Sequence, residues 1–63
     1  MITYLIIDDK RYELMDKPVF FDEGEKVAVL INQKYVPKTV ISVRKLVRPA
    51  GNSADCDMEI TLQ

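Results

Sequence analysis

A high content of β-branched residues constrains the fold of this chain more than any other feature of its sequence. Of its 63 residues, 16 are Val, Ile or Thr, and five more are Tyr or Phe. A third of the chain therefore prefers the pleated geometry of a β-strand. No segment carries apolar residues at a sustained helical spacing between helix caps, so we expect helix only as a short turn. The sequence predicts an all-β fold.

Two apolar segments, residues 2–7 and 10–15, flank the dipeptide Asp8-Asp9 and predict a first hairpin. Aspartate tolerates the positive φ that a two-residue hairpin turn requires. One face of the hairpin, which we expect in the core with Leu5 opposite Tyr12, then carries Leu5, Ile7, Tyr12 and Leu14. The other face is unusually apolar for a wet surface and carries Ile2, Tyr4, Ile6 and Met15, with Arg11 and Glu13 between them.

A second hairpin is predicted around Asn32-Gln33. This dipeptide separates a strand over residues 25–31 from a strand that begins near Tyr35. Counting outward from the turn places Leu30 opposite Tyr35. The two hairpins together predict antiparallel pairing in the first half of the chain.

The second half of the chain predicts two further strand segments. Pro37 cannot donate a backbone hydrogen bond, so we expect an edge position or a bulge there. Residues 39–47 carry apolar residues on both faces, as expected where a strand bends across the corner of a barrel. Residues 49–53 predict the clearest loop of the chain. Residues 57–63 alternate and predict a last strand with Met58, Ile60 and Leu62 facing in and Asp57, Glu59, Thr61 and Gln63 facing out.

These segments predict one small barrel. About five strands in so short a chain must curl to bury their apolar faces and to avoid long open edges. We therefore expect a single domain over residues 1–63. Its predicted fold is a five-stranded, partly open SH3-like barrel built from antiparallel hairpins.

Residues 24–43 follow a recognisable order. A glycine, a charged pair and alternating valines over residues 24–30 precede the turn at residues 32–34, an aromatic residue at 35 and a valine-rich strand at 40–43. This order resembles the SH3-like barrels of the Tudor and KOW type, from which it departs by one residue before Val40 and by Pro37. The resemblance implies a small barrel. Tudor domains that read methylated side chains use a cage of aromatic residues, for which the resemblance offers Tyr35, Phe20 and Phe21.

Charged residues are unevenly distributed, although the net charge is only -1. Residues 33–50 carry five basic residues and no acidic one, and both flanking segments are acidic. We expect a dipolar surface if the basic segment lies on one face. This segment could neutralise nucleic-acid phosphates, or it could form a solvated strand face. The candidate nucleic-acid-binding residues are Lys34, Tyr35, Lys38, Arg44, Lys45 and Arg48.

The residue types of the chain leave little room for catalysis or metal binding. There is no His and only one Cys, which excludes histidine acid–base chemistry, histidine metal sites and an intrachain disulfide. Asp55, Asp57 and Glu59 share one strand face but lack the turn and glycine of a calcium loop, so we expect a solvated charged face. Two acidic pairs lie at predicted turns, Asp8-Asp9 and Asp22-Glu23. We expect no enzyme activity, no cofactor and no metal.

The start of the chain also bears on its compartment. It lacks the basic region of a secretion signal, and no apolar run approaches the ~20 residues needed to cross a bilayer. The lone thiol of Cys56, between two aspartates, suits a reducing compartment. We therefore expect a cytoplasmic protein without membrane contact.

The outer face of the first hairpin points to a function, because small proteins seldom expose a contiguous apolar patch. This face is either the second side of a closed core or an interface. We predict a small non-enzymatic binding protein that acts through contact with a protein partner or with itself, such as an accessory or inhibitor protein of a phage or mobile element. The alternative is a nucleic-acid-binding module that uses the basic segment. The predicted partner-binding residues are Ile2, Tyr4, Ile6, Arg11, Glu13 and Met15.

Overall fold

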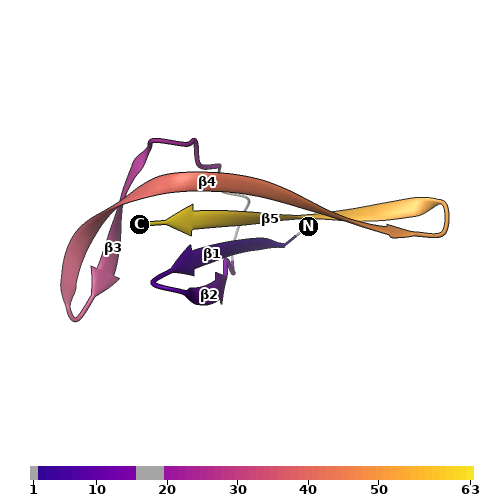
Figure 1. Ribbon diagram of the computed structural model, residues 1–63. Helices are drawn as coiled ribbons and strands as arrows, with labels where there is room; N and C mark the ends of the chain where they lie inside the picture. Colours follow the sequence, from indigo (N-terminus) through magenta and orange to yellow (C-terminus); the bar gives the residue numbers. More distant parts are fainter. Residues whose placement is uncertain (1, 16–19) are drawn as a thin grey trace.

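The structure of the chain is a computed structural model that describes residues 2–15 and 20–63. Every regular element in these residues is a strand, which confirms the predicted all-β class. No helix long and apolar enough to cross a membrane is found among them. The strands are β1 (Thr3–Ile7), β2 (Lys10–Glu13), β3 (Lys26–Ile31), β4 (Lys34–Ala50) and β5 (Ser53–Leu62), labelled in Figure 1.

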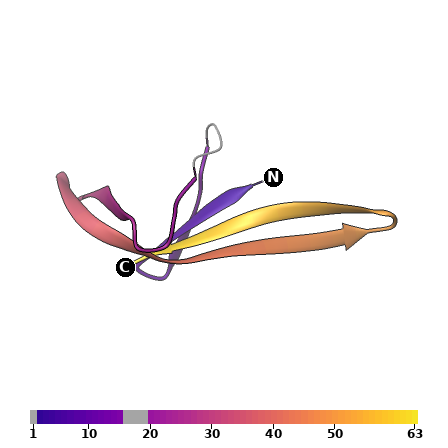
Figure 2. The same ribbon diagram turned by 90° about the horizontal axis from the view of Figure 1, so that it is seen from above.

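The five strands form one sheet in the order β2-β1-β5-β4-β3. The sheet curls into a half-barrel, which is seen from two sides in Figure 1 and Figure 2. Three neighbouring pairs are antiparallel, whereas β1 and β5 are parallel, with Leu5 opposite Ile60. The parallel pair was not part of the predicted set of hairpins. It places the apolar residues of the first and last strands side by side on one face of the sheet.

Both predicted hairpin turns are present. Asp8 and Asp9 have φ values of 51° and 65°, and Asn32 and Gln33 have values of 50° and 66°. Positive φ at both central residues is the signature of a type I′ turn, whose twist matches that of the flanking strands. These turns set the register that the sequence predicted, with Leu5 opposite Tyr12 and Leu30 opposite Tyr35.

Pro37 lies within β4, opposite Ala28, where only β3 flanks the strand. The predicted edge position is therefore confirmed, because the missing N–H belongs to the side of β4 on which the ladder has no partner. A bulge lies farther along, between Val40 and Ser42, and inserts Ile41 as an extra residue. Beyond the bulge, the residues of β4 that face inward change from even to odd positions. This change explains why residues 39–47 carry apolar residues on both faces of what would otherwise be a regular strand.

The loop predicted over residues 49–53 is wrong, because only Gly51 and Asn52 leave the ladder. Gly51 has a φ of 63°, and the two strands continue on either side of this tight turn. Residues 46–57 lie beyond the start of β1 and form a projecting two-stranded ribbon, here called the arm (Figure 1). A two-stranded ribbon is marginally stable alone, so the arm depends on the sheet from which it extends.

The core lies on the inner face of the half-barrel. Its buried apolar residues come from β4 and β5, namely Val40, Met58, Ile60 and Leu62. Leu5 and Ile7 are half-buried against them, and Phe21 packs on the same cluster. Tyr12 was expected in the core but is 48% exposed. The reason is that the half-barrel stays open between its two edge strands.

The open shape leaves a large surface for so short a chain. The radius of gyration is 13.2 Å, against roughly 11 Å for a compact chain of this length. The solvent-accessible surface is 5130 Å² for 7.3 kDa, against about 4,200 Å² for a compact monomer of that mass. The excess of about 900 Å² measures what the half-barrel and the arm leave uncovered.

Candidate functional site: an open groove between the first hairpin and β3

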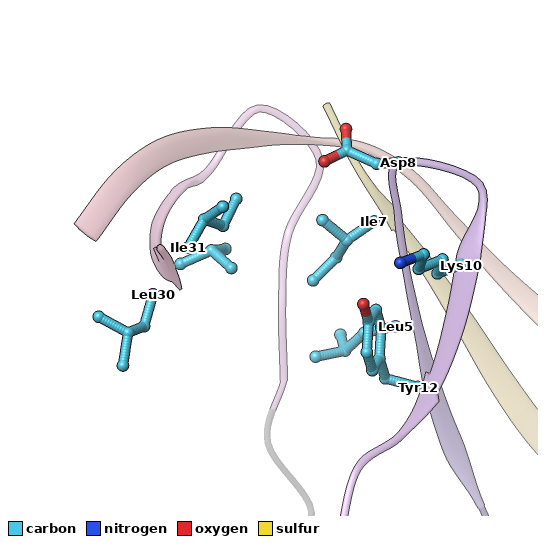
Figure 3. A pocket seen from close by; sticks show the side chains of 8 residues that line it. Leu5, Ile7, Asp8, Lys10, Tyr12, Leu30 and Ile31 are labelled. Atoms are coloured by element: carbon cyan, nitrogen blue, oxygen red, sulfur yellow. The ribbon is translucent and has the colours of Figure 1, made fainter. Parts of the chain in front are cut away.

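An apolar groove of ≈ 410 Å³ lies on the inner side of the half-barrel. The β1–β2 hairpin forms one wall with Leu5, Ile7 and Tyr12, and the end of β3 forms the other. Figure 3 shows Ile7 and Tyr12 on one side of the space and Ile31 on the other. The lining residues of the β3 wall are Val29, Leu30 and Ile31.

The groove exists because β2 and β3 are the two ends of the sheet and do not pair. Residues that face each other in the ladder share one face of a sheet, so the inner face carries Leu5 with Ile60 and Val29 with Val36. In a closed barrel these side chains would meet across the seam and exclude water. Here the seam is open, and apolar side chains expected in the core line a surface groove instead.

Charged groups define one end of the groove. Asp8 and Lys10 belong to its lining, at the turn of the first hairpin. The Lys38 Nζ lies 3.5 Å from the Asp8 Oδ1, so an ion pair connects β4 to this turn. The remaining wall residues are apolar, apart from the hydroxyl group of Tyr12. A segment that binds in the groove would therefore present apolar side chains along it and a polar or charged group at this end.

The predicted partner-binding residues gather on the opposite, outer face of the same hairpin. The ladder places Tyr4 opposite Glu13 and Ile6 opposite Arg11. The Arg11 guanidinium lies 3.7 Å from the centre of the Tyr4 ring, in a cation–π contact that covers part of the ring. Ile2, Tyr4 and Ile6 are half-buried, and the side chain of Met15 is exposed. This face does not belong to the inner core.

The predicted nucleic-acid-binding residues are not brought together on one face. In the ladder Lys34 and Lys38 face Ile31 and Val27, which places them on the inner side. After the bulge, Arg44 and Arg48 face Glu59 and Asp55 on the outer side. Lys45 faces Met58 on the inner side, and Tyr35 faces Leu30 away from the core. The segment therefore divides its positive charge between two faces.

Two acidic residues of β5 depart from the predicted solvated face, because Asp57 is buried and Glu59 is half-buried, whereas Asp55 is exposed as predicted. Arg44 pairs with Glu59, and the Arg48 Nη2 lies 3.2 Å from Asp57 and 4.0 Å from Asp55. These pairs join the basic segment to the acidic one across the β4–β5 ladder. The condition for the expected dipolar surface is not met, because the basic segment lies on both faces and the register of this hairpin places opposite charges face to face.

Asp57 departs furthest from expectation. It was predicted on a solvated face, but only 5% of its surface is exposed. Its Oδ1 accepts a hydrogen bond of 3.1 Å from the backbone N–H of Ile2, while Arg48 approaches the same carboxylate. Asp57 therefore ties the beginning of the first strand to the base of the arm.

Sequence reasoning missed the groove because it placed the groove walls in a closed core. One signal was available, since β3 reads Val-Ala-Val-Leu-Ile after Lys26, with apolar residues on both of its faces. A strand that is apolar on both faces needs cover on both. Leu30 is 59% exposed, which shows that the second cover is absent from the described residues.

No protein family, curated protein or solved structure matches this chain. The structure of residues 24–43 is a strand, a type I′ turn and a second strand, in the order that the resemblance implied. The aromatic residues offered for a cage lie on different sides, because Phe21 packs on the inner core and Tyr35 projects from the outer face.

Proposed function

We propose that this chain is a non-enzymatic protein-binding module whose groove receives apolar side chains of a partner protein. The observation that carries the proposal is the open groove, lined by Leu5, Ile7 and Tyr12 on one side and by the end of β3 on the other. Partly exposed apolar surfaces of this kind mark interaction sites rather than free surface. The charged end formed by Asp8 and Lys10 would orient the bound segment.

A small barrel of the Tudor and KOW type is part of this proposal. The hairpin of residues 24–43 supports it, and the curled five-stranded sheet is compatible with it. Recognition of a methylated side chain by a cage has no support, because the candidate aromatic residues do not converge. The small size of the chain suits an accessory or inhibitor protein that covers a surface of a larger partner.

The outer patch predicted from the sequence is a second candidate surface for the same function, and it consists of Ile2, Tyr4, Ile6, Arg11, Glu13 and Met15. Met15 is 90% exposed and supports it. The Arg11 side chain over the Tyr4 ring counts against it, because a partner would have to displace this contact. The groove has the stronger support, since its apolar walls need no rearrangement to be reached.

Binding of nucleic acid by the basic segment is the alternative, with less support. Lys38, Arg44 and Arg48 each form an ion pair with a carboxylate, which reduces the positive charge available to phosphates. The segment is also divided between two faces by the bulge at Ile41. A salt titration of binding to a labelled single-stranded oligonucleotide tests this alternative, because phosphate contacts weaken steeply with salt.

The proposed groove can be tested with peptides selected from a displayed random library against the wild-type chain. NMR shift mapping should locate the selected peptides at Leu5, Ile7 and Tyr12. Tyr12→Ser should weaken their binding by on the order of 10-fold, because it removes an aromatic wall of the site. Tyr35→Ser is the matched control, since Tyr35 is also an exposed strand tyrosine but lies on the outer face.

Two outcomes would count against the groove. Equal losses from Tyr12→Ser and Tyr35→Ser would reject a site on the inner face. Loss of binding in a Tyr4→Ala and Ile6→Ser double variant, with Tyr12→Ser unaffected, would transfer the function to the outer patch. Circular dichroism of each variant distinguishes lost binding from lost folding.

A further inference from the structure

The open backbone edge of β3 is a second feature that can bind a partner, and it belongs to the strand whose Val29, Leu30 and Ile31 also line the groove. After Lys26, β3 consists of the apolar residues 27–31, without charge or proline. It ends the strand order, so none of the described residues pairs with its far edge. Uncharged, apolar segments of high strand propensity are the ones that recruit further strands.

The edge at the other end of the sheet has the opposite character. Three of the four residues of β2 are charged, namely Lys10, Arg11 and Glu13. Charged residues on an edge strand prevent pairing with other chains. Of the two end strands of the sheet, β2 is therefore protected against pairing with another chain and β3 is not.

The register shows which backbone groups this edge presents. In a two-residue hairpin the residues flanking the turn form a hydrogen-bonded pair, and such pairs alternate along the ladder. Ile31, Val29 and Val27 therefore bond to β4. Thr39, in a pair of the other kind, donates its N–H to Gln63 on the far side of β4, as this alternation requires. The N–H and C=O groups of Lys26, Ala28 and Leu30 consequently point toward the open edge.

We infer that β3 pairs in antiparallel orientation with β3 of a second copy of this chain, around a two-fold axis at Ala28. With Ala28 of the two copies opposite each other, Lys26 lies opposite Leu30 of the second copy. No like charges face each other, and the outward groups form about six backbone hydrogen bonds. On the inner face Val27 lies opposite Val29 of the second copy, which joins the apolar faces of two half-barrels.

The uncovered surface of the chain fits a dimer of this kind. The excess of about 900 Å² over a compact monomer is distributed over the half-barrel and the arm, and it is comparable to the ~800 Å² that each partner contributes to a standard interface. Two-fold pairing uses the β3 edge of both copies, so no further copy can add through β3 and the assembly closes as a dimer. The inference goes beyond the proposed function, because it concerns the backbone edge of β3 and a second copy of the chain, whereas the proposed function concerns the side chains that line the groove.

Amide hydrogen exchange of the unmodified chain, followed by NMR over a range of protein concentrations, tests the inference. The amides of Ala28 and Leu30 should exchange slowly where sedimentation shows a dimer and at least ~10-fold faster on dilution to the monomer. The amides of Arg11 and Glu13 serve as an internal control, since they point outward from β2 and should exchange rapidly at every concentration. A monomer at all concentrations, or a dimer in which Ala28 and Leu30 exchange rapidly, would overturn the inference.

Ala28→Pro is the corresponding variant. It removes an edge donor and no hydrogen bond to β4, so it should weaken the dimer on the order of 30-fold and leave the circular dichroism of the monomer unchanged. Arg11→Pro makes the same change on the β2 edge and should leave the dimer intact. A dimer that survives Ala28→Pro rejects pairing through β3. Because peptide binding at the groove is measured separately with Tyr12→Ser, failure of either proposal leaves the other open to test.

Discussion

Lys38 and Asp8 connect two hairpins that share no backbone pairing. The Lys38 Nζ lies 3.5 Å from the Asp8 Oδ1, at the charged end of the groove. The Lys38 side chain is 17% exposed and the Asp8 side chain 68%. Because Asp8 is open to solvent, the pair is expected to stabilise the fold by no more than about 1 kcal/mol. Its position, rather than its energy, makes it useful as a probe of the half-barrel.

Asp8→Asn tests this connection. Asparagine accepts the positive φ of Asp8, so the substitution keeps the turn and removes only the charge. We expect a loss in the free energy of unfolding of about 0.5 kcal/mol in low salt that disappears in high salt. Urea unfolding at two salt concentrations measures it. Asp9→Asn is the control, and an equal effect at Asp9 would mean that the ion pair contributes nothing.

Asp57→Ala should destabilise the chain by about 1–3 kcal/mol, because it leaves the half-buried N–H of Ile2 without its acceptor and removes the nearer carboxylate partner of Arg48. Asp55→Ala removes a carboxylate from the same face of the same strand, but 79% of that side chain is exposed. It should change stability by less than about 0.5 kcal/mol. Thermal melting of both variants provides the comparison. Similar melting temperatures would show that Asp57 is solvated after all.

Gln33→Gly should stabilise the chain by about 0.5–1 kcal/mol. Gln33 has a φ of 66°, which side-chain-bearing residues adopt only at a cost that glycine avoids. Its side chain is exposed, so the substitution removes no buried contact. Gln33→Ala keeps the unfavourable φ and should not raise the melting temperature. A decrease with glycine would mean that this turn does not hold a type I′ geometry in solution.

Ile60→Val should lower the free energy of unfolding by about 1 kcal/mol, because Ile60 is fully buried at the centre of the sheet. Val47→Ala removes more of a side chain but acts on the arm, where Val47 is 61% exposed. It should cost less than the change at Ile60. Chemical denaturation of the two variants tests the assignment of core and arm. A larger loss at Val47 would indicate that the arm folds back on the sheet.

Local features of the fold were predictable from neighbouring residues. A two-residue turn determines the register of both strands that flank it, so Asp8-Asp9 and Asn32-Gln33 were enough to predict Leu5 opposite Tyr12 and Leu30 opposite Tyr35. Alternation along the last strand likewise placed Ile60 inside. The β4–β5 register is not predicted from the sequence, because the composition of residues 49–53 is that of a loop rather than of a two-residue turn. A turn at Gly51-Asn52 would have placed Arg48 opposite Asp55.

Other features depend on which strands become neighbours, which no local pattern contains. The parallel pairing of β1 with β5 brings Ile2 to Asp57, and it buries a carboxylate that sequence alone placed in water. The bulge at Ile41 divides the basic residues between two faces.

The sequence by itself determined an all-strand chain with two type I′ hairpins, because backbone preference and turn geometry act over a few residues. Only the tertiary structure decided that the sheet stops as a half-barrel with β2 and β3 unpaired. The apolar face of the first hairpin could have met β3 or stayed open, and the sequence pattern is the same in both cases. The balance between closing the seam and keeping the curvature of the sheet is a property of all five strands together. Because the sheet stays open, Tyr12, which the sequence predicts in the core, lines the groove instead.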